Sequence, residues 1–283
     1  MHILITGASG FIGSYFQQHY ASKYQCIPFS FSRYNLGELI LNDVEAIIHL
    51  AAIVHQPNAQ NAEYIHVNIQ RTLELAQKAK ERGVKQFIFM STIAVYNPRL
   101  TLLKENSLLS PTTLYGQSKL EAEKQLLALE DESFKVSIIR PPMVYGANAP
   151  GNIRSLMQLI DKLPILPFGK IKNQRSFVYV GNLCAMIDCI IQTKSCGIFL
   201  ASDDVPLSTT KLIALIAKAK NKKIHLLHVR LFEKILLCIK PSMYQRLFGS
   251  LIVDNSQTKA ILNFKNPYSV DDGIHIMVQG EKE

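Results

Sequence analysis

Tyr115 and Lys119 have a spacing that could support proton transfer. They stand four positions apart in a stretch expected to be helical, Tyr115–Ala128, so both side chains would lie on one face. A free phenol has a pKa of about 10 and is a poor base at neutral pH. A positive charge about 4 Å away is worth about 4 kcal/mol at an effective dielectric constant of about 20, which favours phenolate. The pair could therefore exchange a proton with a reacting oxygen.

Glycines at a regular spacing follow the first apolar segment, His2–Ile5. Gly7 permits a tight turn, Gly10 lets a diphosphate approach the backbone, and Gly13 lets the next helix pack close to the strand. The start of that helix, expected at Ile12–Tyr20, offers amide groups and a positive dipole end to phosphates. The turn predicts a dinucleotide site made by Gly7, Ser9, Gly10, Phe11, Ile12 and Gly13.

Short apolar segments alternate with helical ones through the first half of the chain. This alternation predicts an α/β fold with a Rossmann-type, doubly wound parallel sheet covered on both faces. Between Phe31 and Asp43 there is space only for a short or degraded strand. The expected strands are His2–Ile5, Cys26–Phe31, Ala46–Leu50, Gln86–Met90 and Val136–Ile139, and the expected helices are Ile12–Tyr20, Ile65–Arg82 and Tyr115–Ala128.

After Arg140 the pattern changes, and prolines interrupt the chain. We expect residues 1–150, with 175–202 returning to them, to form the dinucleotide-binding domain. Residues 151–174 and 203–283 would form a smaller, mostly helical substrate-binding lobe at the carboxyl edge of the sheet. A helix at Val229–Ile239 is expected in the core or lid of that lobe, with a place on a membrane surface as the alternative. The other expected elements are a helix at Asn152–Leu163, a strand at Arg175–Val180, a helix at Asn182–Gln192 and a strand at Gly197–Ala201.

The composition excludes several classes of protein. An apolar content of 48% with 19% charged residues argues against disorder, and no run of eighteen apolar residues predicts a membrane span. Five cysteines without a C-x-x-C pair predict neither a disulfide framework nor a metal site, and they fit a reducing cytoplasm. The net charge of +9 is dispersed apart from a lysine run at residues 218–223, which is expected to be solvated surface, so no nucleic-acid partner is expected. His49 and His55 are expected to be structural.

Six segments, in this order, resemble the extended branch of the short-chain dehydrogenase/reductase superfamily, the NAD-dependent epimerase/dehydratase family. They are the glycine turn, His49-Leu50-Ala51-Ala52, Ser91-Thr92-Ile93-Ala94-Val95-Tyr96, Tyr115-Gly116-Gln117-Ser118-Lys119, Arg140-Pro141-Pro142-Met143-Val144-Tyr145-Gly146 and Arg175-Ser176-Phe177-Val178-Tyr179-Val180. The resemblance implies that Tyr115 donates and accepts the proton, that Lys119 binds the nicotinamide ribose, and that Thr92 binds the reacting sugar oxygen.

The same resemblance implies further contacts. Asn68 would brace the site from the following helix, and Arg175 would bind the nucleotide diphosphate. Asn152 and Arg246 are further substrate candidates, with a helix cap and a surface role as their alternatives. The remaining implied cofactor contacts are Leu50, Ala51, Ala52, Ser91 and Pro142.

The segment after the second strand bears on the choice between NAD and NADP. It carries no carboxylate for the adenosine ribose, whereas Arg33 could receive a 2′-phosphate. Arg33 could also stack on adenine or face solvent. NADP is therefore slightly preferred over NAD.

The residues after Thr92 discriminate among reactions. Dehydratases of this branch carry Asp-Glu there, but Ile93 and Ala94 cannot exchange a proton, which disfavours dehydration. What remains is hydride transfer at C4 of a UDP-hexose or UDP-hexosamine derivative, with a 4-ketoreductase preferred and a UDP-sugar 4-epimerase as the alternative. A non-catalytic NADP-sensing regulator is a third hypothesis, disfavoured by the presence of Tyr115 and Lys119. The expected partners are a nucleotide sugar and a second copy in a homodimer, without stable membrane insertion.

Overall fold

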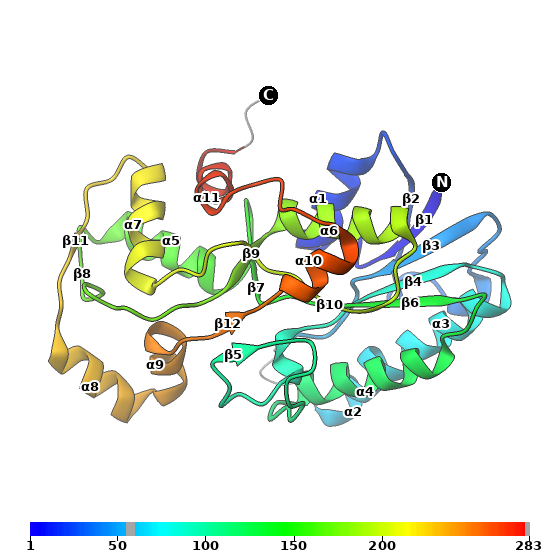
Figure 1. The fold of residues 1–283 in the computed structure, drawn as a ribbon, viewed down its shortest axis with the longest axis horizontal. Coiled ribbons are helices and arrows are strands. Elements are labelled where there is room, and N and C mark those ends of the chain that lie inside the picture. Colours follow the sequence, from blue (N-terminus) through cyan, green and yellow to red (C-terminus); the bar gives the residue numbers. More distant parts are fainter. Residues whose placement is uncertain (55–59, 281–283) are drawn as a thin grey trace.

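A central parallel sheet of six strands organises the computed structural model, which describes residues 1–54 and 60–280 (Figure 1). Its spatial order, β10-β6-β4-β3-β1-β2, is that of a doubly wound sheet and confirms the predicted α/β class. The strands are β1 (His2–Thr6), β2 (Gln25–Phe29), β3 (Val44–His49), β4 (Gln86–Met90), β6 (Lys135–Arg140) and β10 (Gly197–Leu200).

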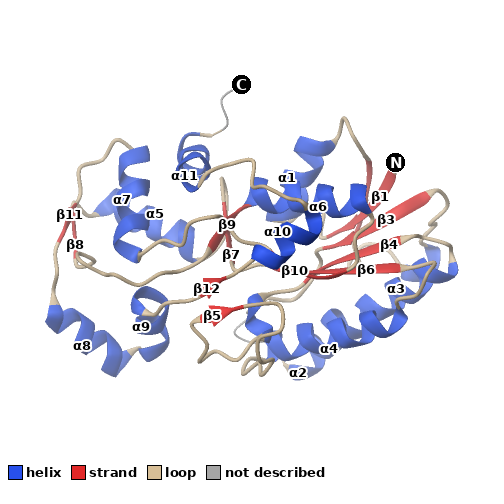
Figure 2. Cartoon of the chain, in the orientation of Figure 1, coloured by secondary structure: helices blue, strands red, loops and turns tan. Residues whose placement is uncertain are grey.

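Helices cover both faces of this sheet (Figure 2). Alternate residues of β1 face opposite ways: Ile3 and Ile5 pack in one core, and Leu4 packs in the other. The first core includes α1 (Phe11–Tyr20) and α6 (Val180–Thr193), and the second includes α3 (Arg71–Glu81) and α4 (Leu114–Leu129). Burial on both faces explains why the strands read as continuous apolar segments.

Two expectations for the first half need correction. Residues 31–43 contain only a short 3-10 helix, η1 (Leu36–Glu38), so the third strand is β3 itself. The helix expected at Ile65–Arg82 begins earlier, with α2 (Asn61–Tyr64), and continues as a π-helical turn η2 (Ile65–Gln70) and then as α3. His55 lies outside the described residues.

The strand expected at Arg175–Val180 does not join the main sheet. It is shortened to β9 (Phe177–Tyr179), which pairs in parallel with β7 (Met143–Tyr145) in a separate two-stranded sheet. Pro141 and Pro142 follow β6 directly and cannot donate ladder hydrogen bonds, so the chain leaves the main sheet there. The later elements α6 and β10 do return to the main sheet, as predicted.

Most of the remaining elements lie beyond the carboxyl ends of the strands, at the left in Figure 1, whereas α10 (Ser256–Leu262) packs against α6 and β10, and α11 (Val270–Gln279) lies nearer the centre. A short pair formed by β5 (Leu102–Leu103) and β12 (Ile252–Val253) carries the chain back toward the sheet after α9. Within the described residues, no helix has the length and apolarity needed to cross a membrane. The elements that follow β7, apart from β9, α6, β10 and β12, are α5 (Asn152–Lys162), β8 (Ile165–Leu166), α7 (Thr209–Ala219), β11 (His225–Leu226), α8 (Arg230–Ile239), α9 (Pro241–Phe248), α10 (Ser256–Leu262) and α11 (Val270–Gln279).

Candidate active site

The glycine turn between β1 and α1 has no room for larger side chains. A Cβ on Gly7 would lie 2.9 Å from the backbone nitrogen of Ala51, and Gly7 has a positive φ of 67°. A Cβ on Gly13 would lie 2.6 Å from the Gly7 carbonyl oxygen. Gly10 closes the turn with its N–H on the Gly7 carbonyl, 2.9 Å away, and precedes α1.

A hollow of about 800 Å³ adjoins this turn and is lined by Ser9, Gly10 and Phe11 on one side and by Ala147, Asn148 and Pro150 on another. The start of α1 directs amide groups and the positive end of the helix dipole to this region. The turn and its lack of side chains fit the diphosphate of a dinucleotide, whereas the hollow also runs along α1, past Tyr15, Gln18 and His19.

A buried chain of hydrogen bonds fixes the backbone of Ala51 opposite the turn. The Ala51 N–H donates to Thr6 Oγ1 at 3.1 Å, and Thr6 Oγ1 lies 2.9 Å from His49 Nδ1. His49 Nε2 lies 2.9 Å from Thr72 Oγ1, which itself donates to the Asn68 carbonyl. Thr72 must therefore accept the proton of His49 Nε2, and His49 Nδ1 accepts that of Thr6.

Burial, with a smaller contribution from Lys119, lowers the pKa of His49 to about 3. The ring is therefore neutral, which this chain of hydrogen bonds requires. His49 thus has a defined structural role, in agreement with the sequence interpretation.

We expect His49→Phe to destabilise the protein by about 1–3 kcal/mol and to weaken dinucleotide binding. The new ring could still pack against Phe87 and Phe89, whose ring centroids lie 5.7 and 5.8 Å from that of His49, but the buried Thr6 and Thr72 hydroxyls would lose their partner. Urea unfolding and dinucleotide titration would measure both effects. His66→Phe, an exposed histidine in the neighbouring π-helical turn, is the control. Equal behaviour of the two variants would contradict the role of His49.

Asn68 lies in the π-helical turn η2 and is buried. Its Oδ1 accepts the Ile53 N–H at 2.8 Å, and its Nδ2 donates to the Ile53 carbonyl and to Ser118 Oγ, both at 3.0 Å. The Ser118 hydroxyl in turn donates to the Tyr115 carbonyl at 2.9 Å. Asn68 therefore connects the segment after β3 with the first turn of α4.

Tyr115 and Lys119 begin α4, one turn apart, as predicted. Burial raises the pKa of Tyr115 to about 12, while a side-chain hydrogen bond with Thr92 acts in the opposite direction. Thr92 Oγ1 already accepts the Ala94 N–H at 3.1 Å, so its own proton is available to the phenolic oxygen. The structure thus brings together two of the predicted catalytic side chains.

Lys119 is almost fully buried, with Nζ 4.0 Å from the centroid of the Phe89 ring. Burial lowers its pKa to about 7, and the carboxylate of Glu123 opposes the shift. A lysine with this pKa can hold its proton or give it up near neutral pH.

The buried Lys119 gives a testable dependence of stability on pH in protein stripped of nucleotide. The unfolded chain has a lysine pKa of about 10.4, so between about pH 7 and pH 10 it binds more protons than the folded chain, and stability should rise with pH by about 1 kcal/mol per unit. Lys119→Met should flatten this slope, whereas Lys124→Met, exposed on the same helix, should not. Urea unfolding at about pH 7.5 and about pH 9.5 would measure it. Parallel profiles for wild type and Lys119→Met would contradict the shift.

The Ser91 hydroxyl donates a hydrogen bond to Glu123. Glu123 also pairs with Arg140, with Oε2 2.6 Å from Nη2 and both side chains buried. The Ser91 side chain binds the carboxylate of this ion pair, and a contact of Ser91 with the cofactor stays a prediction. Glu123 was missed by sequence reasoning, although its place one turn after Lys119 on the same helix face was a signal that could have revealed it.

Three of the four predicted substrate residues, Asn152, Arg175 and Arg246, line one cavity of about 370 Å³. Arg175 is held by the carbonyls of Gln245 and Gly249, at 3.2 and 3.1 Å from Nη1. Burial and then the nearby Arg246 lower the pKa of Arg175, and an arginine still keeps its charge. Two like charges on one cavity favour an anion between them.

A second hollow, of about 360 Å³, shares Arg175 and Arg246 with this cavity and reaches Ile93 and Ala94, next to Thr92. The region where an anion would bind therefore adjoins the strand end that carries Thr92. Among the other predicted contacts, Arg33 is exposed after β2, Leu50 and Ala52 are partly buried after β3, and Pro142 is buried between β6 and β7.

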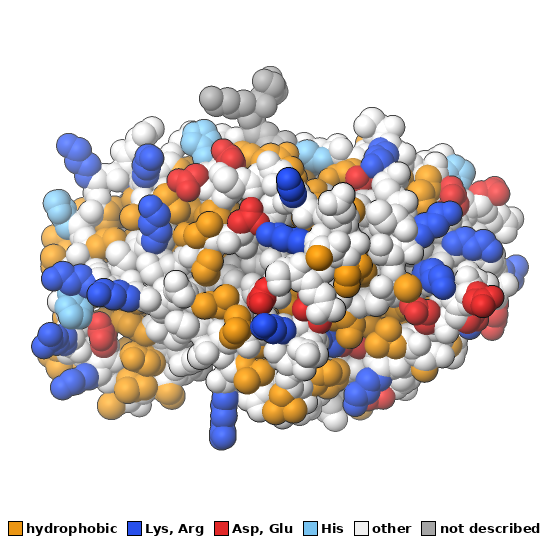
Figure 3. Space-filling model, viewed as in Figure 1, with side chains coloured by type: hydrophobic (Ala, Val, Ile, Leu, Met, Phe, Trp, Pro, Cys, Tyr) orange, Lys and Arg blue, Asp and Glu red, His pale blue; other side chains and the backbone are white. Residues whose placement is uncertain are grey.

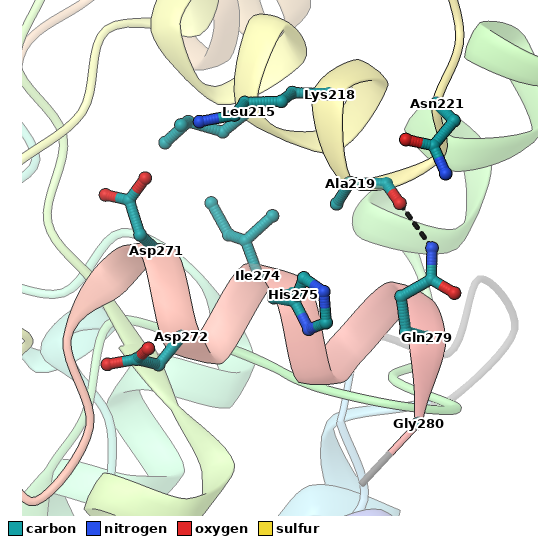
Figure 4. A pocket seen from close by; sticks show the side chains of 10 residues that line it. All are labelled: Leu215, Lys218, Ala219, Asn221, Asp271, Asp272, Ile274, His275, Gln279 and Gly280. Atoms are coloured by element: carbon teal, nitrogen blue, oxygen red, sulfur yellow. Dashed lines mark hydrogen bonds between the residues drawn. The ribbon is translucent and has the colours of Figure 1, made fainter. Parts of the chain in front are cut away.

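A further cleft of about 750 Å³ lies between α7 and α11 and is distinct from these cavities (Figure 4). Gln279 donates across it to the Ala219 carbonyl. Its lining includes Asp271, Asp272 and His275, and none of the predicted site residues.

Comparisons with known proteins agree with this geometry. The family described as "NAD dependent epimerase/dehydratase family" matches residues 3–199. A UDP-glucose 4-epimerase from Vibrio cholerae is 37% identical, over 96% of this chain and 92% of its own length. An N-acetyl-alpha-D-glucosaminyl-diphospho-ditrans,octacis-undecaprenol 4-epimerase from Escherichia coli O157:H7 is 26% identical, over 81% of this chain and 75% of its own.

Two solved structures share the fold. The UDP-glucuronic acid 4-epimerase from Bacillus cereus, in complex with NAD, superposes with a TM-score of 0.79 at 21% identity, covering 99% of this chain and 98% of that one. RMD from Pseudomonas aeruginosa, complexed with NADPH, gives 0.80 at 20% identity, covering 99% of each chain.

Proposed function

The chain belongs to the NAD-dependent epimerase/dehydratase family, and we propose that it is a UDP-sugar 4-epimerase that uses NAD. The Vibrio cholerae relative, similar over nearly its whole length, favours this function over the 4-ketoreductase that the sequence first suggested. The observation that carries the proposal is the hydrogen bond of Tyr115 with Thr92 one turn before the buried Lys119.

In this proposal Tyr115 and Thr92 act on the C4 hydroxyl of the sugar. When bound, NAD supplies the acceptor and later the donor of one hydride at C4. Tyr115 phenolate takes the hydroxyl proton as the C4–H bond breaks, and Thr92 donates a hydrogen bond to the same oxygen. After the keto sugar has rotated in the site, Tyr115 returns the proton as C4 is reduced on its opposite face. Atoms and electrons balance without a further reactant, as an isomerisation requires.

Lys119, Asn68 and the glycine turn would hold the cofactor. The Lys119 ammonium would bind the ribose hydroxyls and stabilise the phenolate by its charge. Asn68 and the hydrogen bonds of His49 would keep the backbone at Ala51 and Ile53 in place. Gly10 would let the diphosphate approach the start of α1.

We propose that Arg175 and Arg246 bind the diphosphate of the UDP-sugar. Their shared cavity supports this because two guanidinium groups can each present paired donors to phosphate oxygens. Asn152, at the start of α5, would contact the same ligand.

NAD is preferred to NADP because the family is NAD-dependent. The only argument that Arg33 offers for NADP is that it is an arginine, a residue type that can bind a 2′-phosphate. Its side chain is exposed after β2. Arg33→Ala should change NAD affinity little, as measured by titration. A large loss of NADP affinity alone would show that Arg33 reads a 2′-phosphate.

Mass spectrometry of the nucleotide that copurifies, together with an assay for interconversion of UDP-glucose and UDP-galactose, tests the function. We expect about one NAD per chain and conversion without added cofactor, because an epimerase regenerates its NAD in each cycle. Protein free of NAD that oxidises NADPH with a UDP-4-keto sugar would instead establish the 4-ketoreductase.

Two further features are proposed with this function. A homodimer is implied by the family resemblance, and light scattering of the purified protein would measure it. A cytoplasmic location is proposed from the sequence, whose five cysteines are scattered and odd in number.

A further inference from the structure

Several large apolar side chains of helix α8 are exposed. Leu231 is 67% exposed, Ile235 47% and Ile239 70%, and Cys238 is also exposed. These four residues recur at the spacing of one helix face. The neighbouring side of the helix attaches α8 to the lobe, where the Phe232 ring lies 5.8 Å from that of Phe168. We call the four exposed residues the apolar stripe.

Basic side chains flank the stripe, with Arg230 and Lys234 on α8 and Lys240 directly after it, and the longer segment that contains α8 is strongly basic. Residues 218–248 hold eight lysines and arginines against one acidic residue, Glu233, so this segment carries +7 of the chain's net +9. Lys220 and Lys222 pair with Asp161, which lies outside this segment. Most of the excess positive charge of the segment remains after these two ion pairs. Figure 3 shows Lys and Arg side chains gathered around apolar ones at the lower left, where Figure 1 places α8. The basic residues are Lys218, Lys220, Lys222, Lys223, Arg230, Lys234, Lys240 and Arg246.

We propose that α8 docks the protein on the surface of an anionic lipid bilayer, with the apolar stripe in the headgroup region and Arg230, Lys234 and Lys240 on lipid phosphates. A helix with one apolar face and basic residues beside it binds membranes in this way. Ten residues span about 15 Å, half the thickness of a bilayer core, so α8 lies in the plane of the surface and does not cross it. The contact goes beyond the proposed epimerase reaction and does not depend on it.

Charge favours a bilayer over other occupants of this face. A second copy of the chain would bring the same positive charges against these, because a two-fold interface is self-complementary. A nucleic acid would match the charge but would leave the apolar stripe in water. An anionic bilayer matches both.

The position of α9 gives the docking a consequence for the site. α9 follows α8 directly and places Ser242, Arg246 and Leu247 on the substrate cavity. A docked protein would therefore hold the opening of this cavity close to the lipid headgroups.

Flotation of the purified full-length protein with vesicles tests the proposal. We expect the protein to float with phosphatidylcholine vesicles that contain about 30% phosphatidylglycerol, and to float poorly with phosphatidylcholine alone. Lys234→Glu/Lys240→Glu should weaken binding by more than tenfold, since each basic residue contributes about fivefold near an anionic surface. Raising the salt concentration should release the wild type.

Leu231→Ser/Ile239→Ser should weaken binding at least about tenfold through the lost apolar contact. The matched control is Ile40→Ser/Ile261→Ser, which removes side chains of 73% and 57% exposure elsewhere on the molecule and should float as the wild type does. Circular dichroism of all variants distinguishes a loss of folding from a loss of docking. UDP-sugar turnover of the same variants tests the proposed reaction separately.

The exposed thiols provide an independent probe. A polarity-sensitive fluorophore on Cys238, in the Cys196→Ser variant, should shift to the blue with anionic vesicles. The same label on Cys196, in the Cys238→Ser variant, should not shift. Absence of flotation with anionic vesicles, equal binding by both apolar double variants, or a vesicle-free dimer that dissociates in Leu231→Ser/Ile239→Ser would each overturn the proposal.

Discussion

Tyr115→Phe should lower the rate of UDP-sugar epimerisation about 10³-fold, within the range that a positioned acid-base group contributes. The substitution removes only the phenolic oxygen, which is the atom proposed to exchange a proton with the C4 hydroxyl. Lys119 and the glycine turn stay in place, so NAD binding should be unchanged. Turnover measured with UDP-glucose, and NAD content measured in the same preparation, would separate the two effects.

Tyr64→Phe is the matched control, because Tyr64 is a buried tyrosine close enough to influence the charge of Tyr115. Its hydroxyl donates to the Val54 carbonyl at 3.3 Å, and we give it no part in proton transfer. The control should retain turnover within about threefold of the wild type. A Tyr115→Phe variant that kept a tenth of the activity would exclude Tyr115 as the base.

The pH dependence of turnover adds a second criterion. Burial raises the pKa of Tyr115 to about 12 in the free chain, so the phenolate that abstracts the proton becomes more abundant as pH rises. The rate should therefore increase with pH in the wild type, up to the pKa that Tyr115 has beside the bound cofactor. The residual rate of Tyr115→Phe should lack this rise.

The sequence was sufficient for features set by local spacing. The parallel sheet follows from apolar segments separated by helices, because each βαβ unit is determined by its own residues. The spacing of the glycine turn is also local, although only Gly13 is required by neighbours close in the chain, Gly7 and Ala8; the space at Gly7 is limited by Leu50 and Ala51 at the end of β3. The spacing of Tyr115 and Lys119 is local too, because four positions along a helix place two side chains on the same face.

Features that depend on distant partners could not be predicted in this way. The departure of β9 from the main sheet is decided by its pairing with β7, more than thirty residues earlier. The π-helical turn at Asn68 depends on partners at Ile53 and Ser118, on other elements. The burial of Val229–Ile239 could not be predicted either. The sequence suggested a core or lid position for this helix, but the packing of the lobe decides whether its apolar face is covered.

Arg140→Met should destabilise the protein by about 3–5 kcal/mol, because it leaves a buried carboxylate without its partner. Arg140 and Glu123 have side chains that are 1% and 2% exposed. Arg140 Nε lies 3.0 Å from Glu123 Oε1, and Nη2 lies 2.6 Å from Oε2, so the pair is bidentate. Urea unfolding would measure the loss.

A second variant distinguishes the unpaired charge from the lost packing. Arg140→Met/Glu123→Leu should recover most of the lost stability, because a buried ion pair can be replaced by apolar residues of similar size at little cost. Lys104→Met is the control for an exposed pair: Lys104 lies 3.6 Å from Asp254, and its loss should cost less than about 1 kcal/mol. A double variant no more stable than Arg140→Met would show that packing, and not the charge, dominates.

The same ion pair should also matter for catalysis, through the strand end that carries Thr92. Glu123 accepts the hydroxyl of Ser91, the residue before Thr92, so α4 and the end of β4 are held together by this carboxylate. In Arg140→Met/Glu123→Leu the fold should recover, but the Ser91 hydroxyl would lose its acceptor and Thr92 would be less firmly placed against Tyr115. We therefore expect stability between those of Arg140→Met and the wild type, because the buried Ser91 and Tyr96 hydroxyls also lose partners, with turnover still reduced by about tenfold. Full recovery of both would show that Thr92 is positioned without Glu123.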